Sequence, residues 1–201
     1  MPLLWIAIIL TSYVIGSIPF GYLIGLNCAG IDITKRGSGN IGATNIAREA
    51  GLRYGIATLI LDVLKGLFPV MVTVVFFDGT GPLAWFSGLG TILGHQFSIF
   101  LRFRGGKGVA TAIGVYIFIA PLECIAALVI FFITVRIWDF ISLGSLILSL
   151  CVPIIFFVSS GSGLSIIMSS IIAALIVFKH RGNIHRMFRG KERRWSLRKI
   201  R

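Results

Sequence analysis

Long apolar stretches separated by short polar connections make up most of this chain. Each has roughly the 20 residues that a helix needs to cross about 30 Å of hydrocarbon, so the stretches predict membrane helices and not the strands of a barrel. They cover approximately residues 3–26, 53–77, 82–98, 109–135, 141–158 and 163–179. The pattern predicts an all-α integral membrane protein, with residues 1–201 as a single polytopic membrane domain.

The composition agrees with this prediction and restricts the partners. A chain that is 56% hydrophobic and 13% charged, with a mean hydropathy of +0.95, is not an ordinary soluble domain. The net charge of +12 could indicate nucleic acid binding, but the basic residues lie beside the apolar stretches, where anionic membrane lipid attracts them. We therefore predict contact with membrane lipid, no nucleic acid partner, and a short basic cytoplasmic tail at about residues 180–201.

The basic residues predict the topology, because cytoplasmic connections retain Lys and Arg. All of them except Lys65 fall in four segments, at residues 35–53, 102–107, 136 and 179–201. To keep these on one side, the chain must cross the membrane twice between Lys107 and Arg136, although residues 109–135 would make only about 40 Å of helix. A six-crossing model would export the tail or the two glycine-rich segments and is disfavoured.

Pro121 lies where a break is needed. It predicts two short helices between residues 105 and 138, at about 105–119 and 121–138. The resulting model has seven transmembrane helices, with the N-terminus outside and the C-terminus in the cytoplasm.

Residues 37–48, the first polar segment, contain glycines, hydroxyls, amides and Arg48 in an otherwise apolar chain. Glycine lets backbone N–H groups approach an oxyanion, and a guanidinium fits phosphate oxygens in pairs. Ala43 and Thr44 follow Gly42 where a nucleotide P-loop would have Lys and then Ser or Thr, so the segment is not a P-loop. Its local composition leaves a flexible connection and an anion-binding loop equally open.

Residues 94–111, the second polar segment, place Lys107 among glycines at the predicted start of a helix. Helix N-termini bind anions, which makes Lys107 a phosphate-binding candidate, whereas His95 is expected to be a hydrogen-bonded structural histidine. The third polar segment, residues 180–186 with Glu192 beyond, is predicted on the same side. Together the three segments suggest a cytoplasmic cavity for a phosphate head and an acyl tail.

Other polar residues have structural explanations. Asp62 and Lys65, spaced i, i+3, are expected to neutralise each other inside the bundle. Ser142 and Ser145 open an apolar stretch, where helix capping and donation to a phosphate are both open. The three cysteines form no C-x-x-C or pairing pattern, so neither a disulfide framework nor a metal site is indicated.

The three polar segments, with residues 61–66, resemble the bacterial acyl-phosphate:glycerol-3-phosphate acyltransferase family over essentially the whole chain. The resemblance implies a multi-pass enzyme of the bacterial inner membrane, with its active site facing the cytoplasm. It implies transfer from a fatty acyl phosphate to the 1-hydroxyl of glycerol 3-phosphate, giving lysophosphatidic acid, the first step of phospholipid synthesis. It leaves open whether the soluble enzyme that makes acyl phosphate is a partner. Consistently, no histidine is followed five residues later by an acid, as in the soluble-faced glycerolipid acyltransferases.

On this basis we predict direct acyl transfer without an acyl-enzyme, a metal or a cofactor. The glycine N–H groups would bind the phosphates together with Ser38, Arg48 and Lys107. Asn45, His180 and Asn183 would align the glycerol hydroxyl. The predicted catalytic residues are Ser38, Arg48, Lys107, His180 and Asn183. The predicted substrate-binding residues are Gly37, Gly39, Asn40, Gly42, Thr44, Asn45, Gly105, Gly106, Gly108, Ser142 and Ser145.

Two other functions fit these features less well. A transporter of a phosphorylated metabolite or lipid would also need convergent cationic segments, but the chain has no visible inverted repeat and its polar clusters are all predicted at one face. A seven-helix photoreceptor is weaker, because residues 163–179 have no interior lysine for a Schiff base.

Overall fold

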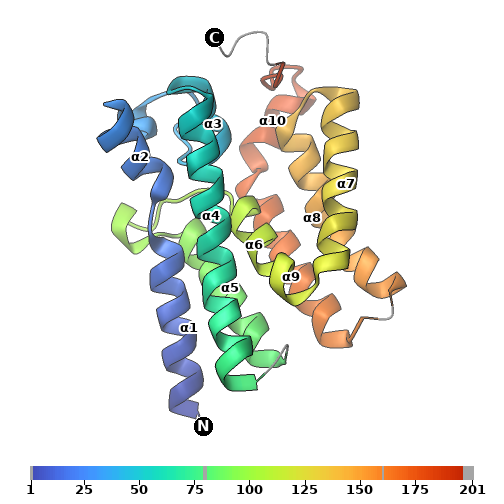
Figure 1. The fold of residues 1–201 in the computed structure, drawn as a ribbon. Helices are drawn as coiled ribbons and strands as arrows, with labels where there is room; N and C mark the ends of the chain where they lie inside the picture. The colour runs from blue at the N-terminus through green and yellow to red at the C-terminus, as the bar shows by residue number, and fades with distance from the viewer. Residues whose placement is uncertain (1, 79–80, 160, 197–201) are drawn as a thin grey trace. The chain divides into compact units, whose positions relative to one another are not determined.

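The computed structural model describes residues 2–78, 81–159 and 161–196. These residues form helices and connections with no strand among them, so the all-α prediction is confirmed. The chain divides between Ile119 and Ala120 into two compact units, unit 1 before this point and unit 2 after it, and each is described by itself (Figure 1). The single polytopic domain stays a prediction.

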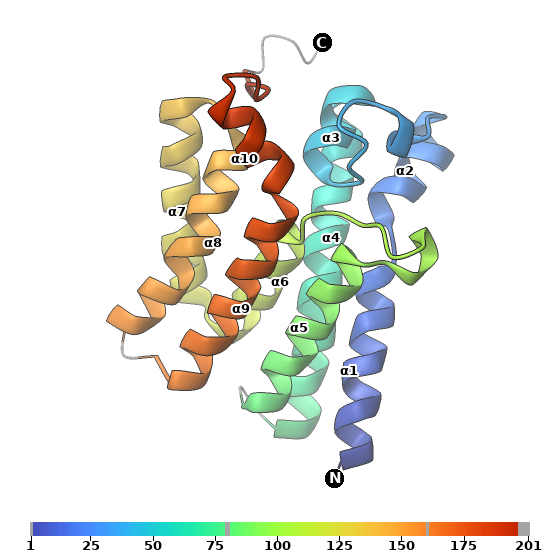
Figure 2. The same ribbon diagram turned by 180° about the vertical axis from the view of Figure 1, so that it is seen from behind.

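Unit 1 is built from six α-helices within its described residues. They are α1 (Pro2–Ser17), α2 (Phe20–Ala29), α3 (Ala43–Glu49), α4 (Leu52–Thr73), α5 (Pro82–Gln96) and α6 (Val109–Ile119), with a π-helical turn at Val74–Asp78 and 3-10 turns at Ile33–Lys35 and Ile99–Leu101. Helix α1 packs against α5, and α4 packs against both α5 and α6. Within this unit, α2 and α3 lie at the end opposite the start of α1 (Figures 1 and 2).

Glycines allow the helices of unit 1 to cross with their backbones in contact. A Cβ atom on Gly94 of α5 would lie 2.1 Å from the Tyr13 carbonyl oxygen of α1, and one on Gly114 of α6 would lie 2.0 Å from the Val63 carbonyl oxygen of α4. Close packing at small residues is a main source of helix association in lipid. The contacts at Gly94 and Gly114 hold the end of α5 and the course of α6 in place. The second polar segment joins these two helices.

The first apolar stretch is not one helix, as residues 3–26 had suggested. It breaks between α1 and α2 at Pro19, which has no N–H group to donate within a helix. Two buried side chains bond to carbonyls at the break: the Ser98 hydroxyl donates to the Ser17 oxygen at 2.5 Å, and Lys65 Nζ donates to the Ile18 oxygen at 2.8 Å. Such partners are needed where a backbone is broken at membrane depth.

Unit 2 contains α7 (Pro121–Trp138), α8 (Ile141–Val158), α9 (Gly163–Lys179) and α10 (Arg181–Phe188). Helix α8 packs against α7 and α9, and α10 leaves the axis of α9 at an angle of 59°. The Trp195 N–H donates to the Asp139 carbonyl at 2.7 Å, so the chain after α10 returns to the α7–α8 connection.

The predicted break at Pro121 is confirmed, because α6 ends at Ile119 and α7 begins at Pro121. The predicted start of the shorter helix was wrong, because α6 begins at Val109 and not near residue 105. Gly108, directly before α6, has φ +86°. Residues other than glycine rarely adopt this left-handed backbone conformation.

Among the described residues, four stretches are long and apolar enough to cross a membrane, and the bent pair α9–α10 would make a fifth. The four are Pro2–Ala29, Leu52–Phe77, Pro121–Trp138 and Ile141–Val158. Helices α5 and α6 are shorter, with 15 and 11 residues. The structure therefore supports a multi-pass membrane protein.

Candidate active site

Asn45 ties the first polar segment into a compact loop. Its side-chain oxygen accepts from the Ser38 N–H at 3.0 Å, and its Nδ2 donates to the carbonyls of Arg36 at 3.1 Å and Asn40 at 2.9 Å. The Asn45 side chain is buried, and both of its amide hydrogens are used inside the loop. These contacts make Asn45 a support of the loop, and its predicted alignment of a hydroxyl stays a prediction.

Two left-handed glycines shape the same loop. Gly37 and Gly39 have φ of +58° and +68°, and a Cβ on Gly37 would lie 2.4 Å from Asn45 Oδ1. Asn40 Oδ1 accepts from the Gly42 N–H at 2.8 Å, just before α3 begins. The loop thus presents Ser38 at an exposed turn.

Thr44 and Arg48 follow on α3, four residues apart and therefore on one helix face. Both are half-buried. The local fold thus joins the predicted phosphate-binding guanidinium to the glycine loop through a single short helix.

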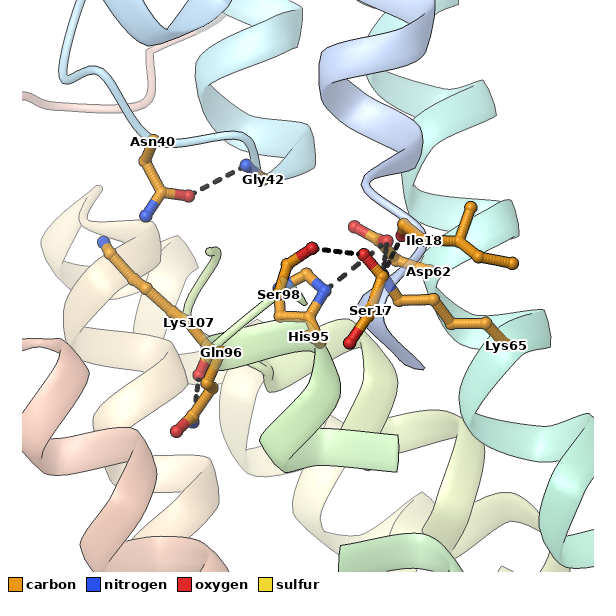
Figure 3. Close-up of polar contacts among 10 residues, drawn as sticks. All are labelled: Ser17, Ile18, Asn40, Gly42, Asp62, Lys65, His95, Gln96, Ser98 and Lys107. Carbon is orange, nitrogen blue, oxygen red and sulfur yellow. Dashed lines mark hydrogen bonds and ion pairs between the residues drawn. The ribbon is translucent and has the colours of Figure 1, made fainter. Parts of the chain in front are cut away.

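The second polar segment is attached to the end of α5. The Gly106 N–H donates to the His95 carbonyl at 3.0 Å, and the Gln96 side chain donates to the Lys107 carbonyl at 2.9 Å. From this loop the side chain of Lys107 points toward the segment that holds Asn40 and Gly42 (Figure 3). Unit 1 therefore brings the two glycine-rich segments together, as the sequence predicted.

An open pocket of about 500 Å³ lies between the first two polar segments, a volume in the range of small-molecule sites. It is lined by Tyr22, Asp32, Thr34, Gly39, Ile41, Phe100, Leu101, Arg102, Arg104 and Gly105. A hydrogen bond from the Thr34 hydroxyl lowers the pKa of Asp32, which also pairs with Lys35 at 3.3 Å. The lining thus combines two arginines with a carboxylate that is already paired, which suits an anionic ligand.

Below these loops, Asp62 and Lys65 form the predicted ion pair on α4, with 2.9 Å between Lys65 Nζ and Asp62 Oδ1. His95 of α5 is a third member, its Nδ1 3.6 Å from the same carboxylate oxygen (Figure 3). All three side chains are at most 3% exposed. The i, i+3 spacing revealed the pair, whereas the histidine comes from another helix, which no local pattern shows.

In unit 2, the third polar segment is held by His180 and Glu192. His180 is buried and its Nδ1 donates to the Ile176 carbonyl at 2.8 Å, so in the neutral ring Nε2 is the acceptor. Asn183 Nδ2 and the Ser142 hydroxyl both donate to Glu192 Oε1, at 2.6 and 2.7 Å. Arg186 Nε donates to Glu192 Oε2 at 2.8 Å.

Glu192 was not among the predicted site residues, although it joins two of them. Burial opposes its ionisation, but hydrogen bonds from Ser142, Asn183 and Arg186 outweigh that effect and lower its pKa. Ser142 therefore donates to a carboxylate, and no side chain caps the start of α8. Ser145 donates to the Ile141 carbonyl at 2.9 Å within its own helix.

Comparison with known proteins agrees with this geometry. The family model for glycerol-3-phosphate acyltransferase matches residues 6–190. The chain belongs to this family. The glycerol-3-phosphate acyltransferases of Geotalea daltonii and Trichlorobacter lovleyi are 49% and 45% identical to it, over 93% and 96% of this chain and 95% and 97% of their own sequences. The resemblance to glycerol-3-phosphate acyltransferases inferred from the motifs is therefore confirmed.

Solved structures of a family member share the fold. The chain is similar to PlsY, an integral membrane glycerol 3-phosphate acyltransferase, in its glycerol 3-phosphate form, with a TM-score of 0.91, 35% identity and 96% of each chain covered. The lysophosphatidic acid form gives a TM-score of 0.90 and 34% identity, over 98% of this chain and 97% of the other.

The Glu192 network gives a pH-dependent prediction. Because the pKa of Glu192 is lowered by folding, its contribution to stability is present above the ordinary carboxyl pKa of about 4.3 and is lost as the pH falls through the lowered value. Glu192→Gln should lower the melting temperature in detergent at neutral pH, and its difference from the wild type should close in acid.

The matched control is Glu123→Gln, which removes an acid of the same unit whose bond to Ser159 is exposed. It should change the melting temperature little. A Glu192→Gln difference that stayed constant from neutral pH to acid would contradict the assignment.

Proposed function

We propose that this protein transfers a fatty acyl group from acyl phosphate to the 1-hydroxyl of glycerol 3-phosphate, forming lysophosphatidic acid and phosphate. One observation carries the proposal: within a chain of this family, two glycine-rich segments of unit 1 border one pocket lined by Arg102 and Arg104, and Lys107 points from the second segment toward the first. Cations and backbone N–H groups that are gathered in this way suit the phosphates of both substrates.

Ser38, Arg48 and Lys107, with the N–H groups of the glycines, would bind these phosphates. The exposed Ser38 turn, the Arg48 face of α3 and the direction of Lys107 support this assignment. In unit 2, we assign alignment of the glycerol hydroxyl to His180 and Asn183. An acceptor Nε2 on His180 and an Asn183 oriented by Glu192 support that role.

Acyl phosphate makes a general base on the protein unnecessary. It is a mixed anhydride, and its phosphate is a far better leaving group than an alkoxide, so positioning and charge neutralisation supply most of the rate. The glycerol oxygen bonds to the acyl carbon, the bond from that carbon to the bridging phosphate oxygen breaks, and the hydroxyl proton passes to a donor phosphate oxygen. This direct route forms no acyl-enzyme.

The membrane arrangement is part of the proposal: seven crossings of a bacterial inner membrane, with the N-terminus outside and the polar segments and tail in the cytoplasm. It is supported by basic residues at one end of each unit, where cytoplasmic anionic lipid would attract them. A reporter enzyme that works only in the cytoplasm should be active when fused after Arg201. Activity of a reporter that works only outside would contradict this topology.

The reaction is tested with purified protein in detergent, given glycerol 3-phosphate and one donor at a time. Lysophosphatidic acid should form from acyl phosphate and not from acyl-CoA or acyl carrier protein. Product made only from acyl-CoA would overturn the donor, and no product from any donor would favour a transporter, which needs a sealed vesicle. A stable acyl-protein adduct from labelled donor would rule out direct transfer.

Lys107→Ala and Arg48→Ala should each lower kcat/KM at least about tenfold, roughly 1.4 kcal/mol of transition-state binding, because each removes a charge that binds phosphate. The exposed residues Lys191 and Arg189 offer matched controls, and their replacement by alanine should leave the rate nearly unchanged. Normal kinetics in folded Lys107→Ala and Arg48→Ala proteins would remove these residues from the site.

A further inference from the structure

Four consecutive residues of the second polar segment, Gly105 to Gly108, rest on two residues at the end of α5. A Cβ on Gly105 would lie 2.1 Å from the His95 carbonyl oxygen, and one on Gly106 would lie 2.0 Å from His95 Nε2. A Cβ on Gly108 would lie 2.9 Å from Gln96 Nε2. No side chain larger than hydrogen fits at these three positions without displacing His95 or Gln96.

Hydrogen bonds fix the backbone on both sides of the Lys107 side chain. The residue before it donates its N–H to His95, and the Lys107 carbonyl accepts from the Gln96 amide at 2.9 Å. Gln96 is fully buried. Since burying an amide is unfavourable unless it is hydrogen-bonded, a buried glutamine that holds a loop carbonyl is better explained by that bond than by packing.

The ring of His95 is itself oriented from the opposite side. Asp62 faces His95 Nδ1, and Lys65 bridges Asp62 to the Ile18 carbonyl at the α1–α2 break (Figure 3). The ring therefore has Asp62 on one side and the Gly106 backbone on the other. Contacts thus run from the break in the first apolar stretch, through the buried charges, to the loop that carries Lys107.

We propose that His95 and Gln96 are positioning residues, which hold the Gly105–Gly108 loop so that Lys107 presents its ammonium group to a substrate phosphate. The inference rests on the proposed function of Lys107. Ordering a loop on binding costs conformational entropy, so a backbone that is already fixed leaves less disorder to remove when the phosphate binds. Neither residue needs to touch the substrate for this effect.

A double-mutant cycle between Gln96→Met and Lys107→Ala tests the inference. Methionine keeps the approximate volume of glutamine and removes the amide, so Gln96→Met should lower kcat/KM about tenfold in the wild type. In the Lys107→Ala background it should have less than about a twofold effect, because the group that it positions is absent. A general loss of stability would lower the rate by the same factor in both backgrounds.

Thr91→Val is the matched control: Thr91 is also fully buried on α5, and its hydroxyl bonds only one turn back, to the Ser87 carbonyl at 3.0 Å. It should have less than about a twofold effect in either background. If Gln96→Met does not purify as a folded protein, the same cycle is run with His95→Asn, which shortens the side chain that supports Gly106.

The outcomes separate the inference from its premise. Equal losses in both backgrounds, with Lys107→Ala itself impaired, would overturn the positioning role and leave the proposed function intact. An unimpaired Lys107→Ala protein would overturn the assignment of Lys107, and the positioning role with it. Coupling that is seen for Gln96 or His95 and absent for Thr91 would support the inference.

Discussion

The ion pair between Lys65 and Asp62 is the interaction on which the architecture of unit 1 depends. Pro19 interrupts the first apolar stretch, and a helix break at membrane depth needs donors for its carbonyl groups. Lys65 supplies one to Ile18, and Asp62 balances the charge of Lys65. An unpaired charge at this depth would be costly, so the break and the pair are best understood as one feature.

The buried side chains of Asp62, Lys65 and His95 lie beneath the candidate site. From Asp62 the contacts continue through His95 to the glycine-rich loop of Lys107, while α2, which starts at the break, packs against α3 and α4 next to the first polar segment. A Cβ on Gly21 of α2 would lie 1.8 Å from the Ile41 carbonyl oxygen, so this contact is equally close. Both glycine-rich segments are thus held from below by buried backbone contacts.

Much of this could be predicted from local patterns. Apolar length predicted the helices, Pro121 the break before α7, and the i, i+3 spacing the Asp62–Lys65 pair. The break at Pro19 was missed because the apolar residues continue on both sides of it. The role of Asn45 within its loop, the approach of His95 to Asp62 and the binding of Ser142 and Asn183 by Glu192 depend on residues brought together only by folding.

The central claim is that the glycine-rich segments bind the phosphate of glycerol 3-phosphate. The most direct measurement is the melting temperature of the purified protein in detergent, without any acyl donor, as glycerol 3-phosphate or glycerol is added. A ligand that binds only the folded state raises the melting temperature with concentration. Glycerol 3-phosphate should do so for the wild type and much less for Lys107→Ala, and glycerol should have no effect. Equal responses to the two ligands, or an undiminished response in Lys107→Ala, would contradict the account.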